Sequence, residues 1–194
     1  SHVSDHPYPE GYDGGRIRGY PETEQSGRDE MFGFLKKKEN KESSYTLGSP
    51  AKGKTVPLSE VNDPTFAEEM LGKGVAVIPA EGRICAPADG KIDMVFDTLH
   101  AVSMVTDYGA EVLIHVGLDT VKMNGEGFKG HVKSGDHVKK GDLLLELDLE
   151  KVKAAGYDTI TPMIVCNTPD YASVEALAGK EVAVGDDVAV LKKH

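Results

Sequence analysis

Two histidines, His100 and His115, have side chains that can do chemistry at neutral pH. His115 lies inside an otherwise apolar run, residues 113–118, two positions ahead of Gly117. A polar group in such a run must reach water or find a partner, so His115 is either a reactive group or a hydrogen-bonded core histidine. His100 opens the preceding apolar segment, and paired strands lie about 5 Å apart. The two imidazoles can therefore meet on one face if these segments pair.

Two adjacent imidazoles suit few reactions. A neutral imidazole is a competent nucleophile near pH 7, so one ring can accept a phosphoryl group while the other donates a hydrogen bond to its oxygens. A metal site would need a third ligand at a fixed spacing. The remaining histidines are expected to be inert, because they lie near the chain ends or beside a Gly-Asp turn: His2, His6, His131, His137 and His194.

The elements around these histidines read as short strands. After Pro50, apolar runs alternate with Gly, Pro and Asp about every ten residues, which favours an antiparallel sandwich or barrel. The predicted strands cover residues 74–79, 83–86, 91–96, 101–105, 111–116, 142–147 and 163–166. Two short helices are predicted at residues 63–71 and 148–156, each with an Asp cap and a Gly stop. The expected fold is therefore all-β with one or two short helices.

A short internal sequence repeat supports this fold class. Residues 134–142 resemble residues 179–188, and both read as a short strand, a Gly-Asp turn and a second strand. Two copies of one turn unit predict a sandwich with pseudo-symmetric halves.

The composition divides the chain into two parts. Residues 1–49 are rich in Gly, Pro, Ser, Glu and Asp, and we expect a flexible tail, either a linker or a cloning remnant. Residues 50–194 form the predicted β-domain. The net charge of -10 disfavours binding to nucleic acid or anionic lipid. The two cysteines lack a CxxC spacing and no apolar run reaches a membrane-spanning length, so a reduced, cytoplasmic protein is expected.

The segment LIHVGLDTV at residues 113–121 resembles the signature around the phosphorylated histidine of glucose-type enzyme IIA domains. These domains belong to the bacterial phosphoenolpyruvate-dependent sugar phosphotransferase system. The resemblance runs in order from about residue 50 to 193. It includes residues 63–67, 86–90, 98–101 and 124–128, and Thr161-Pro162 ahead of Asn167.

The resemblance implies roles for individual residues. His115 would accept the phosphoryl group on Nε2, with its Nδ1 held by the Gly117 carbonyl. His100 would stabilise charge on the phosphoryl oxygens, and Thr98 would orient His100. Partner proteins would dock through the acidic Asp63 and Asp119 and an apolar rim that includes Phe66, Met70, Leu71, Phe96, Leu113 and Val121, around Gly117.

The implied activity is a two-step phosphotransfer for sugar uptake. Phosphorylated HPr would donate to His115, which would pass the group to a cysteine of an enzyme IIB domain. No metal or other cofactor is implied, and contact with the membrane would be indirect, through the permease.

Three other functions would each require a different feature of the sequence. A regulatory docking module would use His115 phosphorylation as its switch. A zinc hydrolase of related architecture would need an HxH pair, which the sequence lacks. A biotinyl or lipoyl carrier would need a Met-Lys hairpin, whereas Lys122-Met123 has the reverse order.

Overall fold

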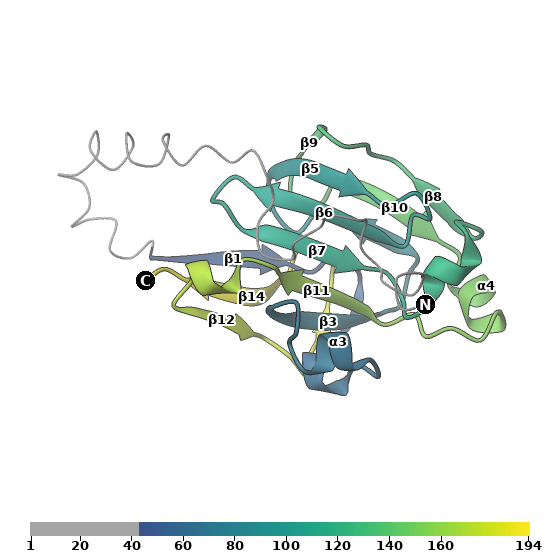
Figure 1. Cartoon of the computed structure of the whole chain (residues 1–194), viewed down its shortest axis with the longest axis horizontal. Coiled ribbons are helices and arrows are strands. Elements are labelled where there is room, and N and C mark those ends of the chain that lie inside the picture. The colour runs from purple at the N-terminus through teal and green to yellow at the C-terminus, as the bar shows by residue number, and fades with distance from the viewer. Residues whose placement is uncertain (1–42) are drawn as a thin grey trace.

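Three antiparallel sheets make up the computed structural model, which describes residues 43–194 (Figure 1). The largest sheet has eight strands and carries both histidine segments at its centre. Its strands follow the order β13 (Glu181–Val182), β2 (Gly53–Val56), β3 (Lys73–Pro79), β11 (Thr161–Val165), β7 (Glu111–His115), β6 (Ala101–Thr106), β5 (Gly90–Val95) and β9 (His137–Val138).

Two three-stranded sheets complete the sandwich. One has the order β4 (Arg83–Cys85), β10 (Leu143–Leu147), β8 (Phe128–Gly130), and the other β1 (Ser44–Gly48), β14 (Asp187–Lys192), β12 (Ser173–Ala176). The main core lies between them and one face of the large sheet, as Ile84, Ile114 and Leu191 illustrate with 0% exposure each. Because every strand alternates its side chains, the opposite face of the large sheet also carries residues that must be covered.

A second, smaller core covers that opposite face. It contains Phe66, Ala101, Leu113 and Ile164, and it is covered by η4 (Leu58–Glu60) and α3 (Pro64–Ala67). The predicted 63–71 helix is therefore too long. Asp63 caps α3 by accepting from the Thr65 amide at 3.0 Å, but the chain turns into the left-handed region at Glu69, with φ 56°.

The second predicted helix is confirmed as α4 (Leu149–Ala154). Its cap residue Asp148 accepts from the Lys151 amide at 3.1 Å, and Gly156 follows with φ 90°. A positive φ costs glycine little, so the stop signal that the sequence contains works as expected. Two further single turns are present, η5 (Thr120–Met123) and η6 (Thr168–Asp170).

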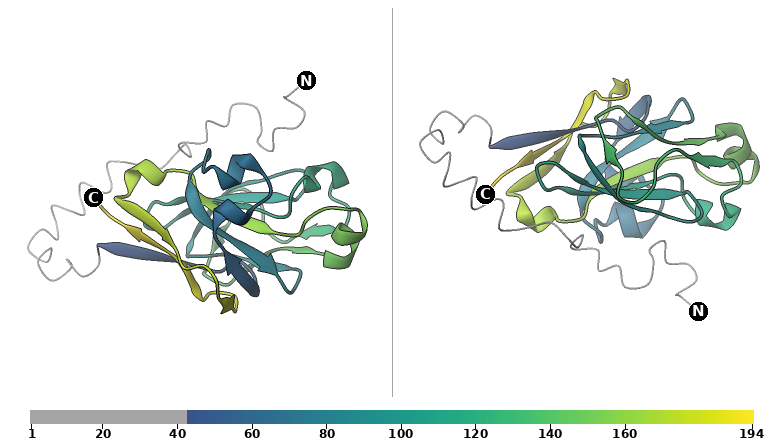
Figure 2. Two further views of the ribbon diagram at one scale, coloured as in Figure 1. Left: turned by 90° about the horizontal axis from the view of Figure 1, so that it is seen from below. Right: turned by 90° about the horizontal axis from the view of Figure 1, so that it is seen from above.

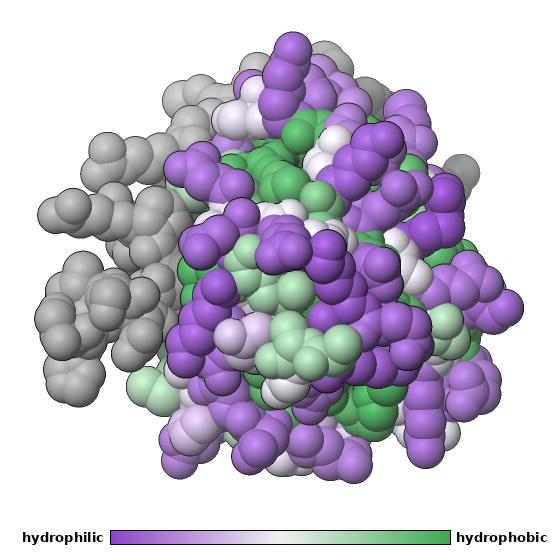
Figure 3. Space-filling view, turned by 90° about the vertical axis from the view of Figure 1, so that its right-hand side faces the viewer, coloured by the Kyte–Doolittle hydropathy of each residue, from purple (hydrophilic) through white to green (hydrophobic). Residues whose placement is uncertain are grey.

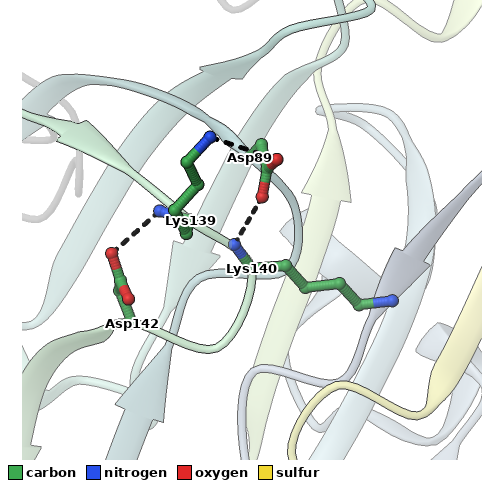
Figure 4. A network of polar contacts seen from close by, with 4 residues as sticks. All are labelled: Asp89, Lys139, Lys140 and Asp142. Atoms are coloured by element: carbon green, nitrogen blue, oxygen red, sulfur yellow. Dashed lines mark hydrogen bonds and ion pairs between the residues drawn. The ribbon is translucent and has the colours of Figure 1, made fainter.

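The Gly-Asp turns of the repeated segments share one geometry. In each, the Asp carboxylate accepts from the amide three residues earlier, and the preceding Gly has a φ near 90°. The turns are Lys133 to Asp136 at 3.0 Å, Lys139 to Asp142 at 2.8 Å and Ala183 to Asp186 at 2.8 Å. Figure 4 shows how the second turn is also tied to Asp89, which accepts from the Lys140 amide at 2.8 Å and pairs with the Lys139 ammonium at 3.7 Å.

The architecture confirms the expected fold class as a sandwich without a closed barrel. All seven predicted strands are present, each within two residues at either end. The predicted boundary between residues 49 and 50 does not match the fold, since residues 44–48 form β1 and pair with β14. The first residues of the predicted tail, 1–42, lie outside the described residues.

The described domain begins and ends on the same side. Ser44 pairs with Lys192. The start of β1 and the C-terminus lie at the end of the molecule opposite α4 (Figure 1), and the two further views also place them close together (Figure 2). Within residues 43–194, no helix is both long and apolar enough to cross a membrane.

Candidate phosphotransfer site

His115 ends β7 and His100 immediately precedes β6, its neighbour in the sheet. The register pairs Ala101 with His115, and the Val116 amide donates to the His100 carbonyl at 2.6 Å. The two imidazoles meet edge to face, with ring centroids 5.1 Å apart. The structure therefore brings together the two histidines that the sequence singled out, on the face of the smaller core.

Hydrogen bonds orient both rings. His115 Nδ1 lies 2.7 Å from the Gly117 carbonyl oxygen. Because a carbonyl can only accept, this contact places the ring proton on Nδ1 and leaves a lone pair on Nε2. His100 Nδ1 bonds the Thr98 hydroxyl, and His100 Nε2 is buried with no hydrogen-bond partner. A buried polar atom without a partner is unusual, and here it lies in the ring that contacts His115.

A phenyl ring supports each imidazole. Phe66 packs against His115 with centroids 5.0 Å apart, and Phe96 packs edge-on against His100 at 5.3 Å. Phe66 is only 1% exposed and Phe96 9%. The sequence predicted both side chains in a docking rim, but in the structure they are buried in the smaller core.

The rest of the expected rim is divided between core and surface. Leu113 is fully buried beneath the site, so it offers no contact area. Met70 is 69% exposed, and Leu71 and Val121 are partly exposed. Asp119 is exposed and Asp63 partly so. Seen from the side toward which β7 points, the surface is mainly hydrophilic with separate hydrophobic patches (Figure 3).

Burial keeps both imidazoles neutral at pH 7. Desolvation, together with a smaller contribution from the neighbouring His115, lowers the pKa of His100 to about 4. Desolvation likewise lowers the pKa of His115 to about 4, opposed by the Gly117 carbonyl and by the charges of Asp63 and Asp119. Both rings therefore hold one proton each, and the Nε2 lone pair of His115 is available.

Backbone strain gathers around the pair. Among the described residues, four non-glycine residues have positive φ: Glu69, Leu99, Asp119 and Asn124. Leu99 directly precedes His100, Asp119 and Asn124 bracket η5 after His115, and Glu69 follows the helix that carries Phe66. Strained residues of this kind cluster at functional sites. These left-handed positions were not predicted from the sequence, although Asp and Asn are residue types that tolerate this conformation.

The site contains no ready metal centre. Across residues 43–194, no three His, Cys, Asp or Glu side chains come together in a way that could hold a metal ion.

A comparison with known families shows to which family the chain belongs. The profile of the phosphoenolpyruvate-dependent sugar phosphotransferase system, EIIA 1 family matches residues 45–171. The chain belongs to this family. The glucose-type EIIA resemblance expected from the sequence is thus confirmed, and phosphotransferase activity follows in general from membership.

Individual relatives agree with the EIIA assignment. The glucose-specific EIIA component of Oceanobacillus iheyensis is 43% identical over 154 residues, covering 79% of this chain and 93% of the relative. The β-glucoside-specific EIIBCA component of Bacillus subtilis is 51% identical over 130 residues, 67% of this chain but 21% of that longer protein. The structure of glucose permease IIA from Mycoplasma capricolum superposes with a TM-score of 0.72 at 37% identity, covering 77% of this chain and 96% of that one.

Proposed function

We propose that this EIIA domain relays a phosphoryl group on Nε2 of His115, from phosphorylated HPr to a cysteine of an EIIB domain. The observation that carries the proposal is the hydrogen bond from His115 Nδ1 to the Gly117 carbonyl at 2.7 Å. It leaves Nε2 as the nucleophilic nitrogen of an imidazole that burial keeps neutral.

Each of the two proposed transfer steps exchanges one bond to phosphorus for another and needs no cofactor. In the first step the Nε2 lone pair attacks the phosphorus of the donor phosphohistidine, an N–P bond forms and the donor N–P bond breaks. The proton on Nδ1 stays in place, and the Gly117 carbonyl stabilises the positive charge that the ring gains. In the second step a cysteine thiolate attacks phosphorus, an S–P bond forms and Nε2 recovers its lone pair.

His100 fits the role of stabilising the group in flight. Its Nε2 is buried and unpartnered, and its ring contacts His115. With the Thr98 hydroxyl donating to Nδ1, the His100 proton resides on Nε2 and is free for a phosphoryl oxygen. The transferred group thus receives a directed hydrogen bond, which is the usual means by which proteins catalyse phosphoryl transfer.

Docking is proposed to use the exposed part of the rim. Asp63 and Asp119 supply negative charge next to His115, and Met70 supplies exposed apolar surface. Such a surface fits a partner that combines an arginine with apolar side chains. The EIIB partner is supported by relatives such as the EIIBCA component, whose name joins the B and A units in one chain.

A labelling experiment tests the proposal. The protein is incubated with phosphoenolpyruvate, enzyme I and HPr, and acid-labile phosphate is measured. His115→Ala should take up none, whereas His137→Ala, which alters an exposed histidine on β9, should label like the wild type. His100→Gln should be labelled but pass its phosphate to EIIB slowly. Normal labelling of His115→Ala would refute the assignment.

A further inference from the structure

We infer that Thr120 is a positioning residue that holds His115 in the tautomer needed for phosphoryl acceptance. The inference about the tautomer stands on contacts alone, while its consequence for transfer rests on the proposed function. Thr120 is 0% exposed and opens η5. It acts through the backbone of residues 116–118.

The first contact fixes the peptide that joins Val116 to Gly117. The Thr120 hydroxyl donates to the Val116 carbonyl at 2.6 Å. At the other end of the same peptide plane, the Gly117 amide donates to the Ile160 carbonyl at 3.1 Å. A plane held at both ends cannot rotate without breaking a hydrogen bond in a buried site, which is costly.

The next peptide plane carries the contact to the ring. Its carbonyl, that of Gly117, accepts from His115 Nδ1 at 2.7 Å. Its amide, that of Leu118, donates to the Asp158 carbonyl at 3.0 Å. The two planes share the Cα of Gly117, so a rotation of the first plane moves the carbonyl that selects the tautomer.

Packing reinforces the hydrogen bond. Gly117 has φ +81°, and a Cβ built there would lie 2.6 Å from Cγ2 of Thr120 and 2.8 Å from the Asp158 carbonyl oxygen. The methyl group of Thr120 therefore lies directly against the glycine whose carbonyl aims at His115. Both branches of the Thr120 side chain therefore help to hold the Gly117 carbonyl in place. The hydroxyl acts through its hydrogen bond to Val116, and the methyl acts through its contact with Gly117.

The chemical consequence concerns a single proton. Without the Thr120 hydroxyl, the buried Val116 carbonyl loses this donor, and the first plane gains freedom to turn toward another. The Gly117 carbonyl then no longer stays aligned with Nδ1, and the imidazole populates both neutral tautomers. Only the tautomer with the proton on Nδ1 presents a lone pair at Nε2.

Two substitutions separate the hydroxyl from the methyl. Thr120→Val keeps the shape and removes the hydroxyl, whereas Thr120→Ser keeps the hydroxyl and removes the methyl. The matched control is Thr55→Val, because Thr55 is equally buried and its hydroxyl donates to the Leu177 carbonyl at 3.1 Å, on β2 and away from the histidines. Ring tautomers are read from ¹⁵N-histidine NMR of the full chain, and transfer is timed from phosphorylated HPr.

We expect Thr120→Val to mix the His115 tautomers and to slow phosphoryl acceptance about tenfold, the effect of losing about one hydrogen bond of positioning. Thr55→Val should keep the Nδ1–H tautomer and normal transfer. Thr120→Ser should also keep the Nδ1–H tautomer, and its transfer should slow less than in Thr120→Val because only the methyl contact with Gly117 is lost. A single Nδ1–H tautomer in folded Thr120→Val would overturn the inference. If Thr120→Val does not fold, Thr120→Ser decides, because mixed tautomers in that variant would mean that packing rather than the hydroxyl orients the ring.

The NMR readout separates this inference from the proposed function. If the wild type shows the Nδ1–H tautomer but takes up no phosphate, the proposed function fails and the role of Thr120 still stands. If His115 is phosphorylated while Thr120→Val retains both tautomer and rate, the relay stands and the role of Thr120 fails.

Discussion

The substitution Gly117→Ala is expected to be far more damaging than the same change at another left-handed glycine. Gly117 has φ +81°, and for an L-residue this conformation costs about 1–2 kcal/mol. The added Cβ would also lie 2.6 Å from Thr120 Cγ2 and 2.8 Å from the Asp158 carbonyl oxygen. Overpacking of this kind costs about 1–3 kcal/mol more, so the total is about 2–5 kcal/mol.

Gly156→Ala provides the matched control. Gly156 has φ +90°, but a Cβ there meets nothing within 4 Å, so only the conformational part of the cost remains. Urea unfolding of both variants measures the difference, which we expect to be about 1–3 kcal/mol. Phosphoryl acceptance should fall in Gly117→Ala only. Equal destabilisation of the two variants would show that Thr120 and Asp158 leave enough room for a Cβ at Gly117, and would refute this reasoning.

Three further predictions concern the site and its support. Because the pKa values of buried His100 and His115 are about 4 in the fold against an ordinary 6.5, the unfolded chain binds protons first as the pH falls. The contribution of the two neutral histidines to the free energy of unfolding should be fully present above pH 6.5 and should be lost as the pH falls toward 4. At pH 5 the loss should be about 2 kcal/mol per histidine. Urea unfolding at several pH values measures this loss, which should be smaller in His100→Gln. Phe66→Ala should cost about 3–5 kcal/mol and raise the His115 pKa in an NMR titration as water reaches the ring; an unchanged pKa would argue against desolvation by Phe66. Asp148→Ala should cost about 1 kcal/mol in thermal unfolding by removing the α4 cap, with unchanged phosphorylation, and a loss of labelling would contradict this purely structural role.

Much of the fold was predictable because its signals are local. Alternating polar and apolar side chains mark residues 91–96, and a short, mostly apolar run ahead of Gly117 marks residues 111–116. The structure contains these two segments as β5 and β7. The Asp148 cap and Gly156 stop likewise define α4 within a few residues. Strand β1 was missed because its apolar side chains are few and it gains its order from pairing with β14, a contact between opposite ends of the domain.

The site was predictable in its residues but not in its geometry. The motif around His115 and the upstream His100 identified the pair, yet only the register of β6 and β7 brings the rings together. Burial of Phe66 was not predictable from its place beside exposed Met70, because α3 ends after one turn and directs Phe66 inward. The left-handed Leu99 has no sequence signal, since leucine is not a residue type that favours this conformation.

If Nε2 of His115 accepts the phosphoryl group, the N–P bond must form at that nitrogen, and its position can be measured. The protein labelled with ¹⁵N-histidine is phosphorylated through HPr, and ¹H–¹⁵N–³¹P correlation NMR assigns the phosphorus to one ring nitrogen. We predict a single phosphohistidine at Nε2 of His115, with the proton retained on Nδ1. Phosphorus on Nδ1 of His115, or on His100, would refute the proposed relay through Nε2.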